Sequence, residues 1–389
     1  MIKHSNDIFY QLKSWCETEG FMGWDPFDGL NSRIFNSTPL KYSRFFRLLW
    51  IQFFKRSPIN FRKLAVVPKG FNPQALGLFL STYSKYYKLT NDAKALDILH
   101  QLSEQLIKQQ SKGWSGACWG YNFDWQARAF RQPAFSPTIV PTTFAVYGLL
   151  DANEILQDPK IEAIARSSAL FVLNDLNKTT DPEGNFAYSY SPLDQTVVYN
   201  ASLLASKLLA RLSTLSDREE LLANARKSVH FCVSNQQNDG SWAYGTKPYH
   251  QWIDSFHTGY NLECIQEYQK YSGDNNYNEA INKGLDYYIK TFFQQEEAPW
   301  YYSDRKYPVD INCPAQLIST LYNLGKLDDH KKTVDKTLQW TFDHLLNKNG
   351  YFYYQKRKYF TSRIPYIRWA QAWMMYALIL HIDHYAENK

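Results

Sequence analysis

The 389-residue chain has few of the features that mark several common protein classes. It contains no run of about 18 apolar residues, so no membrane-spanning helix is predicted. Its five cysteines are widely separated and form no Cys-x-x-Cys pair, which indicates neither a disulfide framework nor a zinc ribbon. The His-x-x-x-His and His-Glu-x-x-His patterns are also missing. We therefore expect no metal site and no cofactor.

Targeting signals and concentrated charge are sparse as well. The first residues lack the apolar core and the small-residue cleavage site of a secretory signal, so a cytoplasmic location is the simplest expectation. The net charge is only +6 and is spread along the chain. No helix carries a stripe of Lys and Arg, which argues against a nucleic-acid-binding protein. A mildly basic surface is compatible with an acidic ligand.

Aromatic residues, by contrast, are abundant. They make up 17% of the chain, and 29 of them are tyrosines. Each tyrosine hydroxyl needs water, a protein partner or a ligand. Many of these rings must therefore lie where a polar group can reach them.

An apolar helical segment with a small residue near its start recurs six times along the chain. The small residues are Ala75, Thr143, Ala201, Gly259, Ala315 and Ala370. They are 55 to 68 residues apart, which leaves room for a second, more polar helix in each interval. Six such hairpins predict an all-α fold, an (α/α)6 toroid whose apolar inner helices are wrapped by amphipathic outer ones. An ordinary helical bundle or an open solenoid is the alternative.

The repeats define the domain organisation. We expect a toroid domain over residues 66–389, preceded by an extension over 1–65 that packs on it. Within the extension, the segment 41–63 sets Phe45, Phe46, Leu48, Leu49, Trp50, Ile51, Phe53 and Phe54 among Lys and Arg. Such a segment can lie on an anionic membrane surface, as a peripheral contact with the inner membrane. Packing of its apolar side on the toroid is the interpretation we favour.

Long connections precede five of the six inner helices and are rich in aromatic residues, glycine and charge. Because they occupy the same place in each repeat, they must gather at one mouth of the ring. A concave site with converging loops is the default ligand site.

Three of these loops end in an aspartate just before the apolar helix: Asp194, Asp254 and Asp310. Asp254 and Asp310 each lie five residues before their small residue, so we expect equivalent positions on neighbouring hairpins, facing one cleft. Two carboxylates in one cavity can act as acid and base on a glycosidic bond. Helix N-capping explains each aspartate taken singly.

His257 follows Asp254 by three residues and lies on nearly the same helical face. It can serve as a general acid or base near neutral pH. A buried histidine that simply hydrogen-bonds Asp254 is the alternative.

Charged and aromatic residues complete the candidate rim. Asp124 and Arg128 belong to the first long loop, while Arg363 and Arg368 flank the start of the last inner helix. Arginines beside a helix N-terminus suit a carboxylate, phosphate or sulfate, and salt bridges to Asp194 or Asp310 are the alternative. The candidate stacking rings are Trp125, Tyr190, Tyr199, Trp242, Trp252, Tyr302 and Trp369. About half of such rings simply pack loops together.

In this order, the motifs CWGYNFDWQARAF, SPLDQT, DGSWAYG, WIDSFHTGY, YPVDINCPAQ and IPYIRWAQAW resemble a bacterial family encoded in exopolysaccharide and capsule biosynthesis clusters. The resemblance spans nearly the whole chain, from WDPFDGLNS at Trp24 onward. Some members carry the label delta-aminolevulinic acid dehydratase, which does not fit a chain without a β/α-barrel pattern or paired active-site lysines. More distantly, the toroid resembles unsaturated glucuronyl hydrolases, N-acylglucosamine epimerases and glucuronyl C5-epimerases. No catalytic motif of those families transfers to this chain.

A second resemblance concerns SNQQNDGSW, which ends at Trp242 and is similar to the QW motif of squalene cyclase and prenyltransferase toroids. In those families the motif is structural, which implies a mainly structural Trp242. The acidic motif of the cyclases, Asp-x-Asp-Asp, is missing.

Residues and resemblance together predict a carbohydrate-active protein of polysaccharide biosynthesis. Its expected partner is an acidic oligo- or polysaccharide, free or lipid-linked, bound in the central cleft. Hydrolysis, elimination and epimerisation are the expected reactions, with Asp254 and Asp310 as the acid/base pair, His257 as an auxiliary base and Asp194 as a further candidate. A non-catalytic glycan-binding or scaffolding subunit is the alternative, and a terpene cyclase or prenyltransferase is the third reading.

Overall fold

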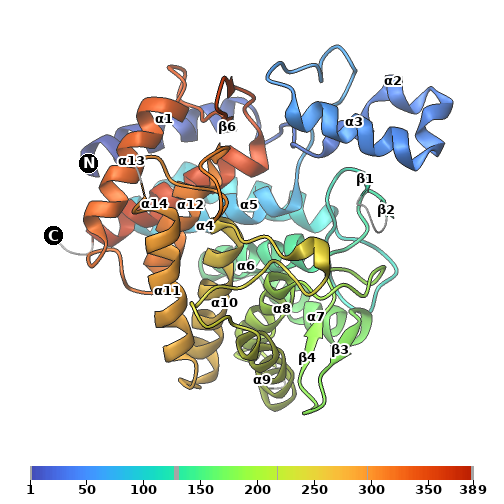
Figure 1. Ribbon diagram of the computed structural model, residues 1–389, viewed down its shortest axis with the longest axis vertical. Helices are drawn as coiled ribbons and strands as arrows, with labels where there is room; N and C mark the ends of the chain where they lie inside the picture. The colour runs from blue at the N-terminus through green and yellow to red at the C-terminus, as the bar shows by residue number, and fades with distance from the viewer. Residues whose placement is uncertain (1, 127–130, 217, 296, 387–389) are drawn as a thin grey trace.

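The computed structural model describes residues 2–126, 131–216, 218–295 and 297–386. Within these ranges, six mostly buried helices lie at the centre of the molecule (Figure 1). These inner helices are α4 (Pro73–Thr90), α6 (Ile139–Leu156), α8 (Tyr199–Leu212), α10 (Ser255–Ser272), α12 (Asn312–Asn323) and α14 (Trp373–Ala386).

The inner helices form a closed ring. Each contacts its neighbours in chain order, and α14 returns to contact α4. Each also packs against at least one outer helix. The outer helices are α5 (Ala93–Lys108), α7 (Pro159–Leu170), α9 (Arg218–Ser234), α11 (Asn278–Phe292), α13 (Lys331–Leu345) and, beside α14, α1 (Ile2–Thr18). The predicted (α/α)6 toroid is confirmed.

The sequence explains which helix lies inside. All residues of α8 are buried, because it is enclosed by α6, α9 and α10. Helix α5 instead buries a stripe with helical spacing, formed by Ala95, Leu99, Leu102 and Leu106, and turns its charged residues outward. Because the inner helices are buried on all sides and the outer helices on one side, the helices form two concentric layers.

The closest approach in the ring is between α4 and α6, where two glycines face each other. A Cβ atom added at Gly77 would lie 2.1 Å from the carbonyl oxygen of Phe144, and one at Gly148 would lie 2.4 Å from the carbonyl oxygen of Gly77. Even alanine would therefore force these two backbones apart.

The predicted extension divides into two parts. Helix α1 packs on α14 and completes the outer layer, whereas residues 24–67 lie as a separate layer beside the loops (Figure 1). That layer contains η1 (Asp28–Asn31), α2 (Arg33–Asn36), η2 (Pro39–Tyr42) and α3 (Arg44–Arg56). It is joined to the last loop of the ring by a cluster of buried rings that includes Trp24, Phe54 and Tyr366.

Short antiparallel ladders stiffen the long loops. They are β1 (Trp125–Gln126) with β2 (Arg131–Gln132), β3 (Lys178–Thr180) with β4 (Phe186–Tyr188), and the three-stranded set β5 (Val309–Asp310), β6 (Gln355–Lys356) and β7 (Thr361–Ser362). In the last set Asp310 lies opposite Gln355. The loop before α12 is thereby tied to the loop before the last inner helix.

Buried ion pairs fill the centre of the ring toward the C-terminal halves of the inner helices. Lys207 Nζ on α8 lies 2.8 Å from Glu263 Oε1 on α10, and both side chains are less than a tenth exposed. The second Glu263 oxygen accepts a hydrogen bond from Ser319 Oγ at 2.8 Å. Nearby, Arg211 Nη2 lies 2.6 Å from Asp151 Oδ1.

Among the described helices, none is long and apolar enough to cross a membrane.

Candidate functional site

Two adjoining cavities open at the end of the ring where the long loops gather. The outer cavity has a volume of about 730 Å³ and the inner one about 150 Å³. Together they form one cleft, since they share six lining residues: Phe27, Trp125, Tyr190, Tyr244, His257 and Trp369. These residues come from the extension, from three long loops and from the start of two inner helices.

A hollow of similar size, about 790 Å³, lies on the outside of the ring between α7 and the start of α9. None of its described lining residues is aromatic, and its Arg166 is paired with Glu162 on the same helix. The cleft instead combines many aromatic rings with converging polar groups, which is the pattern of a ligand site.

The cleft contains a histidine that is held by a buried carboxylate. Asp254 caps the N-terminus of α10 and accepts a hydrogen bond from the backbone N–H of His257 at 2.7 Å. The same carboxylate lies 2.8 and 3.0 Å from Nδ1 of His257. A carboxylate can only accept, so Nδ1 carries the hydrogen and Nε2 is the basic nitrogen. Capping and orientation of the imidazole thus coexist in Asp254.

One wall of the cleft is a stack of rings. Tyr244 and Trp252 lie face to face, with centroids 4.3 Å apart and planes 14° apart. His257 meets the Tyr244 ring edge-on at 4.8 Å. Trp252 is 36% exposed, so the stack presents an aromatic surface to the mouth of the cleft. The opposite wall contains Trp369 and Phe27, whose rings are 5.8 Å apart.

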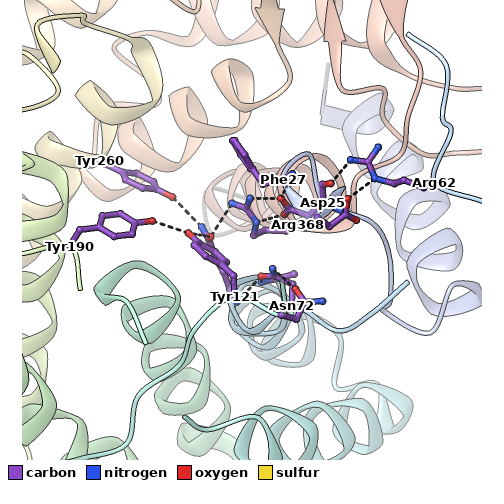
Figure 2. A network of polar contacts seen from close by, with 12 residues as sticks. Asp25, Phe27, Arg62, Asn72, Tyr121, Tyr190, Tyr260 and Arg368 are labelled. Atoms are coloured by element: carbon purple, nitrogen blue, oxygen red, sulfur yellow. Dashed lines mark hydrogen bonds and ion pairs between the residues drawn. The ribbon is translucent and has the colours of Figure 1, made fainter. Parts of the chain in front are cut away.

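The floor of the inner cavity contains a buried ion pair, shown in Figure 2. Arg368 donates from Nε and Nη2 to the two carboxylate oxygens of Asp25, at 2.6 and 3.0 Å. Its Nη1 donates to Gln74 Oε1 at 3.2 Å. Both charged side chains are about 5% exposed, and the fork-to-fork geometry neutralises the guanidinium within the protein.

Three tyrosine hydroxyls lie on the same floor, those of Tyr121, Tyr190 and Tyr260 (Figure 2). Gln74 Nε2 donates to the hydroxyl of Tyr260, and the hydroxyl of Tyr121 donates to Gln74 Oε1, each at 3.4 Å. The hydroxyls of Tyr121 and Tyr190 are also 3.4 Å apart. Burial raises the pKa of Tyr190 and Tyr260 well above the ordinary value, so both keep their protons.

A second ion pair, between Arg62 and Asp28, holds the backbone of Asp25. Arg62 Nε donates to Asp28 Oδ1 at 2.7 Å, and its Nη2 donates to the carbonyl oxygen of Asp25 at 2.7 Å (Figure 2). Asp28 in turn accepts a hydrogen bond from the backbone N–H of Asp25 at 2.9 Å. Burial raises the pKa of Asp28 to about 6 although Arg62 acts in the opposite direction. The extension is thereby locked to the floor of the cleft.

Asp310 is fully buried and does not line the cleft. Its Oδ1 accepts hydrogen bonds from the backbone N–H of Asn312 and from Trp369 Nε1, both at 2.9 Å, and its Oδ2 accepts from Gln355 Nε2. Burial raises the pKa of this carboxyl to about 6, against the lowering effect of the three donors. Asp310 therefore positions the Trp369 ring.

The expectation that Asp254 and Asp310 face one cavity needs correction. Neither carboxylate lines the cleft, because His257 holds both oxygens of Asp254, and donors from Asn312, Trp369 and Gln355 hold those of Asp310. Asp194 is held in the same way, by the N–H and hydroxyl groups of Ser191 and Thr196 at 2.6 to 2.9 Å. The described part of the chain contains no group of three or more His, Cys, Asp or Glu placed to hold a metal ion.

Six of the residues expected to bind a ligand do line the cleft: Trp125, Tyr190, Trp252, Tyr302, Arg368 and Trp369. Arg368 pairs with Asp25, however, and neither with Asp194 nor with Asp310 as the alternative had it. The helix that follows Pro365 begins as the π-helical segment η5 (Ile367–Ala372) and continues as α14.

The other expected ligand-binding residues lie elsewhere. Trp242 is 2% exposed and donates its indole N–H to the carbonyl oxygen of Cys232 at 2.9 Å, so it packs an outer helix against the following loop. Tyr199 is buried at the first turn of α8. Asp124 pairs with Arg131 at 2.7 Å, and the Arg363 guanidinium lies over the Tyr353 ring. Arg128 falls outside the described residues.

Sequence reasoning missed several residues of the floor and mouth. They are Asp25, Phe27, Lys55, Gln74, Tyr121 and Tyr260. The only available signal was the segment WDPFDGLNS, in which Asp25 and Asp28 flank Phe27. Nothing in its local pattern indicates that it reaches the last inner helix.

No family model matches the chain, and no curated protein matches it in sequence. Solved structures do share its fold. A cellobiose 2-epimerase from Bacillus thermoamylovorans is 12% identical, with a TM-score of 0.64 over 81% of this chain and 88% of the other. An unsaturated glucuronyl hydrolase specific for heparin is 14% identical, with a TM-score of 0.59 over 81% and 87%.

A polysaccharide lyase is similar to the same extent, at 13% identity and a TM-score of 0.57 over 81% of this chain and 91% of the other. At these identities the likeness shows the (α/α)6 fold alone. The structures named here come from an epimerase, a hydrolase and a lyase, all of them toroids named for saccharide chemistry.

Proposed function

We propose that this protein is a carbohydrate-active enzyme in which His257 exchanges a proton with a saccharide bound in the cleft. The observation that carries the proposal is the His257–Asp254 pair, in which a buried carboxylate holds Nδ1 while the imidazole lines both cavities. Such a carboxylate fixes the tautomer and stabilises the imidazolium that forms. The imidazole then acts as a general base near neutral pH.

The reaction that suits this site is removal of a proton from a carbon next to a carbonyl or carboxylate group. Hydrolysis by the usual mechanism needs two carboxyl groups beside the glycosidic bond, and none of the described residues that line the cleft is acidic. In the proposed step, Nε2 of His257 takes the C–H proton and the electron pair moves into an enolate. The hydroxyl of Tyr190 or Tyr260 then returns a proton, to the carbon in an epimerisation or to the departing oxygen in an elimination.

The charge of the cleft favours an acidic saccharide. Lys55 and Arg56 line its mouth, whereas Arg368 at its floor is neutralised by Asp25. No Asp or Glu occurs among the described lining residues, so the electrostatic potential in the mouth of the cleft is positive. The exposed face of Trp252 offers a platform on which the C–H face of a pyranose packs. We therefore expect a uronic-acid-containing substrate.

We place this substrate, free or lipid-linked, in the cytoplasmic biosynthesis of a bacterial surface polysaccharide. The support is the motif resemblance to a family encoded in exopolysaccharide and capsule clusters. The shared fold with saccharide-processing toroids supports the saccharide and leaves the pathway as our proposal.

The test is proton exchange in heavy water. The wild-type protein, incubated with uronic-acid oligosaccharides and neutral reducing disaccharides, should incorporate deuterium at carbon, seen by NMR, or form an unsaturated uronide, seen by ultraviolet absorbance. His257→Gln should lower that rate by about 100-fold or more, because the base is removed. His230→Gln, on the exposed side of α9, is the matched control and should leave the rate unchanged. Equal rates in the wild type and His257→Gln would refute the proposal.

A non-catalytic glycan-binding subunit is the second candidate. It is favoured by the floor of the cleft, where Asp25 already neutralises Arg368. In that case, wild type and His257→Gln would bind acidic oligosaccharides alike in calorimetry, and neither would catalyse exchange. A terpene cyclase or prenyltransferase is disfavoured, because it needs an aromatic cavity largely free of charge.

A further inference from the structure

We propose that the outer face of helix α3 docks on an anionic lipid bilayer. The proposal stands apart from the saccharide chemistry, because it concerns a surface outside the cleft. Helix α3 has apolar side chains on two opposite sides. Ile51 and Phe54 are buried in the extension, whereas Phe45, Leu49 and Phe53 point to solvent and are 68%, 55% and 44% exposed.

The exposed side chains form a continuous surface, which we call the α3 patch: Tyr42, Phe45, Phe46, Leu49 and Phe53. The rings of Phe45 and Phe46 are 5.4 Å apart, and the spacing of the patch follows one helical face. Ile59 and Leu64, in the loop that follows α3, are exposed as well. Soluble monomers rarely expose such a cluster of large apolar residues unless it binds a partner or a membrane.

The charge around the patch identifies the partner. No Asp or Glu occurs between Gly29 and Asn91. The basic side chains of this stretch that are exposed around α3 include Arg33, Arg44 and Lys63. Phenylalanine and leucine on one face with Lys and Arg at its edges suit a helix lying in the interface of an anionic bilayer. Each basic residue near such a surface adds attraction.

A second copy of this chain fits the patch poorly. Two patches face to face would bring two sets of positive charges together with no carboxylate in the segment to offset them. A bilayer with anionic headgroups accommodates the apolar side chains of the patch and attracts the basic side chains around it.

The remaining side of α3 explains what docking does for the cleft. Leu48, Gln52 and Lys55 line the outer cavity. One helix therefore carries the patch on one side and a wall of the cleft on another. Docking of the patch brings the mouth of the cleft beside the lipid headgroups.

The experiment is flotation of the full chain with vesicles of phosphatidylcholine alone or mixed with phosphatidylglycerol. We expect binding to the mixed vesicles, weakened by salt, and little binding to phosphatidylcholine. Phe45→Ser/Leu49→Ser should lower the partition coefficient by about tenfold or more. Both side chains are exposed, so the melting temperature should stay within a few degrees of the wild type.

Leu170→Ser/Leu193→Ser is the matched control, since these two leucines are about as exposed but lie away from α3. It should float like the wild type. Arg44→Glu/Lys63→Glu should weaken binding at low salt most. Failure of the wild type to float with anionic vesicles, or equal flotation of Phe45→Ser/Leu49→Ser, would overturn the proposal. Concentration-dependent dimerisation abolished by Phe45→Ser/Leu49→Ser without vesicle binding would overturn it in favour of an interface between copies.

Discussion

The two ends of the ring bury charge in opposite ways. Toward the C-terminal halves of the inner helices, cations and carboxylates from neighbouring helices meet directly, as in Lys207–Glu263 and Arg211–Asp151. At the loop-bearing end, His257 borders an open cleft and its carboxylate stands behind it. Ion pairs between neighbouring inner helices fill one end, whereas at the other end the pair of Arg368 with Asp25 forms a floor above which His257 faces an open cleft.

The difference comes from what connects the helices. Short turns join five of the inner helices to the outer helices that follow them, for example α4 to α5. The long loops at the other end bring rings and donors that hold the aspartates and keep the helix starts apart. Buried charge is thus held by protein partners at both ends, and at the loop-bearing end one buried carboxylate, Asp254, also orients a histidine that lines the cleft.

The largest expected effect is on stability, in the variant Glu263→Gln, and it tests whether the ion pairs between inner helices stabilise the fold. Glu263→Gln leaves Lys207 as an uncompensated buried cation, so the free energy of unfolding should fall by about 3–5 kcal/mol. Chemical denaturation measures it. The double variant Lys207→Met/Glu263→Leu should recover most of the loss, since it removes both charges. A loss below about 1 kcal/mol in Glu263→Gln would contradict a structural role for the pair.

Asp254→Asn should give the next largest effect, in rate instead of stability. Asparagine caps a helix about as well as aspartate, so the melting temperature should change little. It cannot stabilise the imidazolium of His257, and we expect the exchange rate to fall by about 100-fold or more. Unfolding of this variant, with normal activity in the folded fraction, would show that Asp254 only caps α10.

The smallest effect is expected in the pH dependence of Asp310, which is buried among neutral donors and not beside a paired cation. Because its pKa in the folded protein is about 6, above the ordinary value of 3.8, stability is fully present below pH 4 and is lost as the pH rises toward 6. Asp310→Asn lacks this loss. The difference in unfolding free energy between the variant and the wild type should therefore rise in favour of the variant between pH 4 and 6, by about 1–3 kcal/mol. Parallel stability curves would show that Asp310 is not strained by burial.

The ring could be predicted from the sequence because the pattern that produces it is local and recurs in every hairpin. A small residue at the start of each inner helix, such as Gly259, allows close packing, and a Cβ there would lie 2.5 Å from Gln316 on the next inner helix. The contact of Asp254 with His257 was accessible for the same reason, since it lies within one turn.

The floor of the cleft could not be predicted from the sequence, because it depends on contacts between distant segments. Asp25 and Arg368 meet only when the extension folds back on the last inner helix. The orientation of Asp310 depends on Gln355 and Trp369, which no helical period relates to it. Equal spacing placed Asp254 and Asp310 alike along their helices, yet the side chains take different partners.

The pairing of α1 with α14 has a consequence for how the protein is made. Helix α1 packs against α14, which is synthesised much later, and α14 also supplies the contact with α4 that closes the ring. Until synthesis reaches this helix, the sides of α1 and α4 that contact α14 in the folded protein stay uncovered, and the ring is an open arc. The nascent chain therefore exposes this apolar surface for longer than a protein whose hairpins close in chain order.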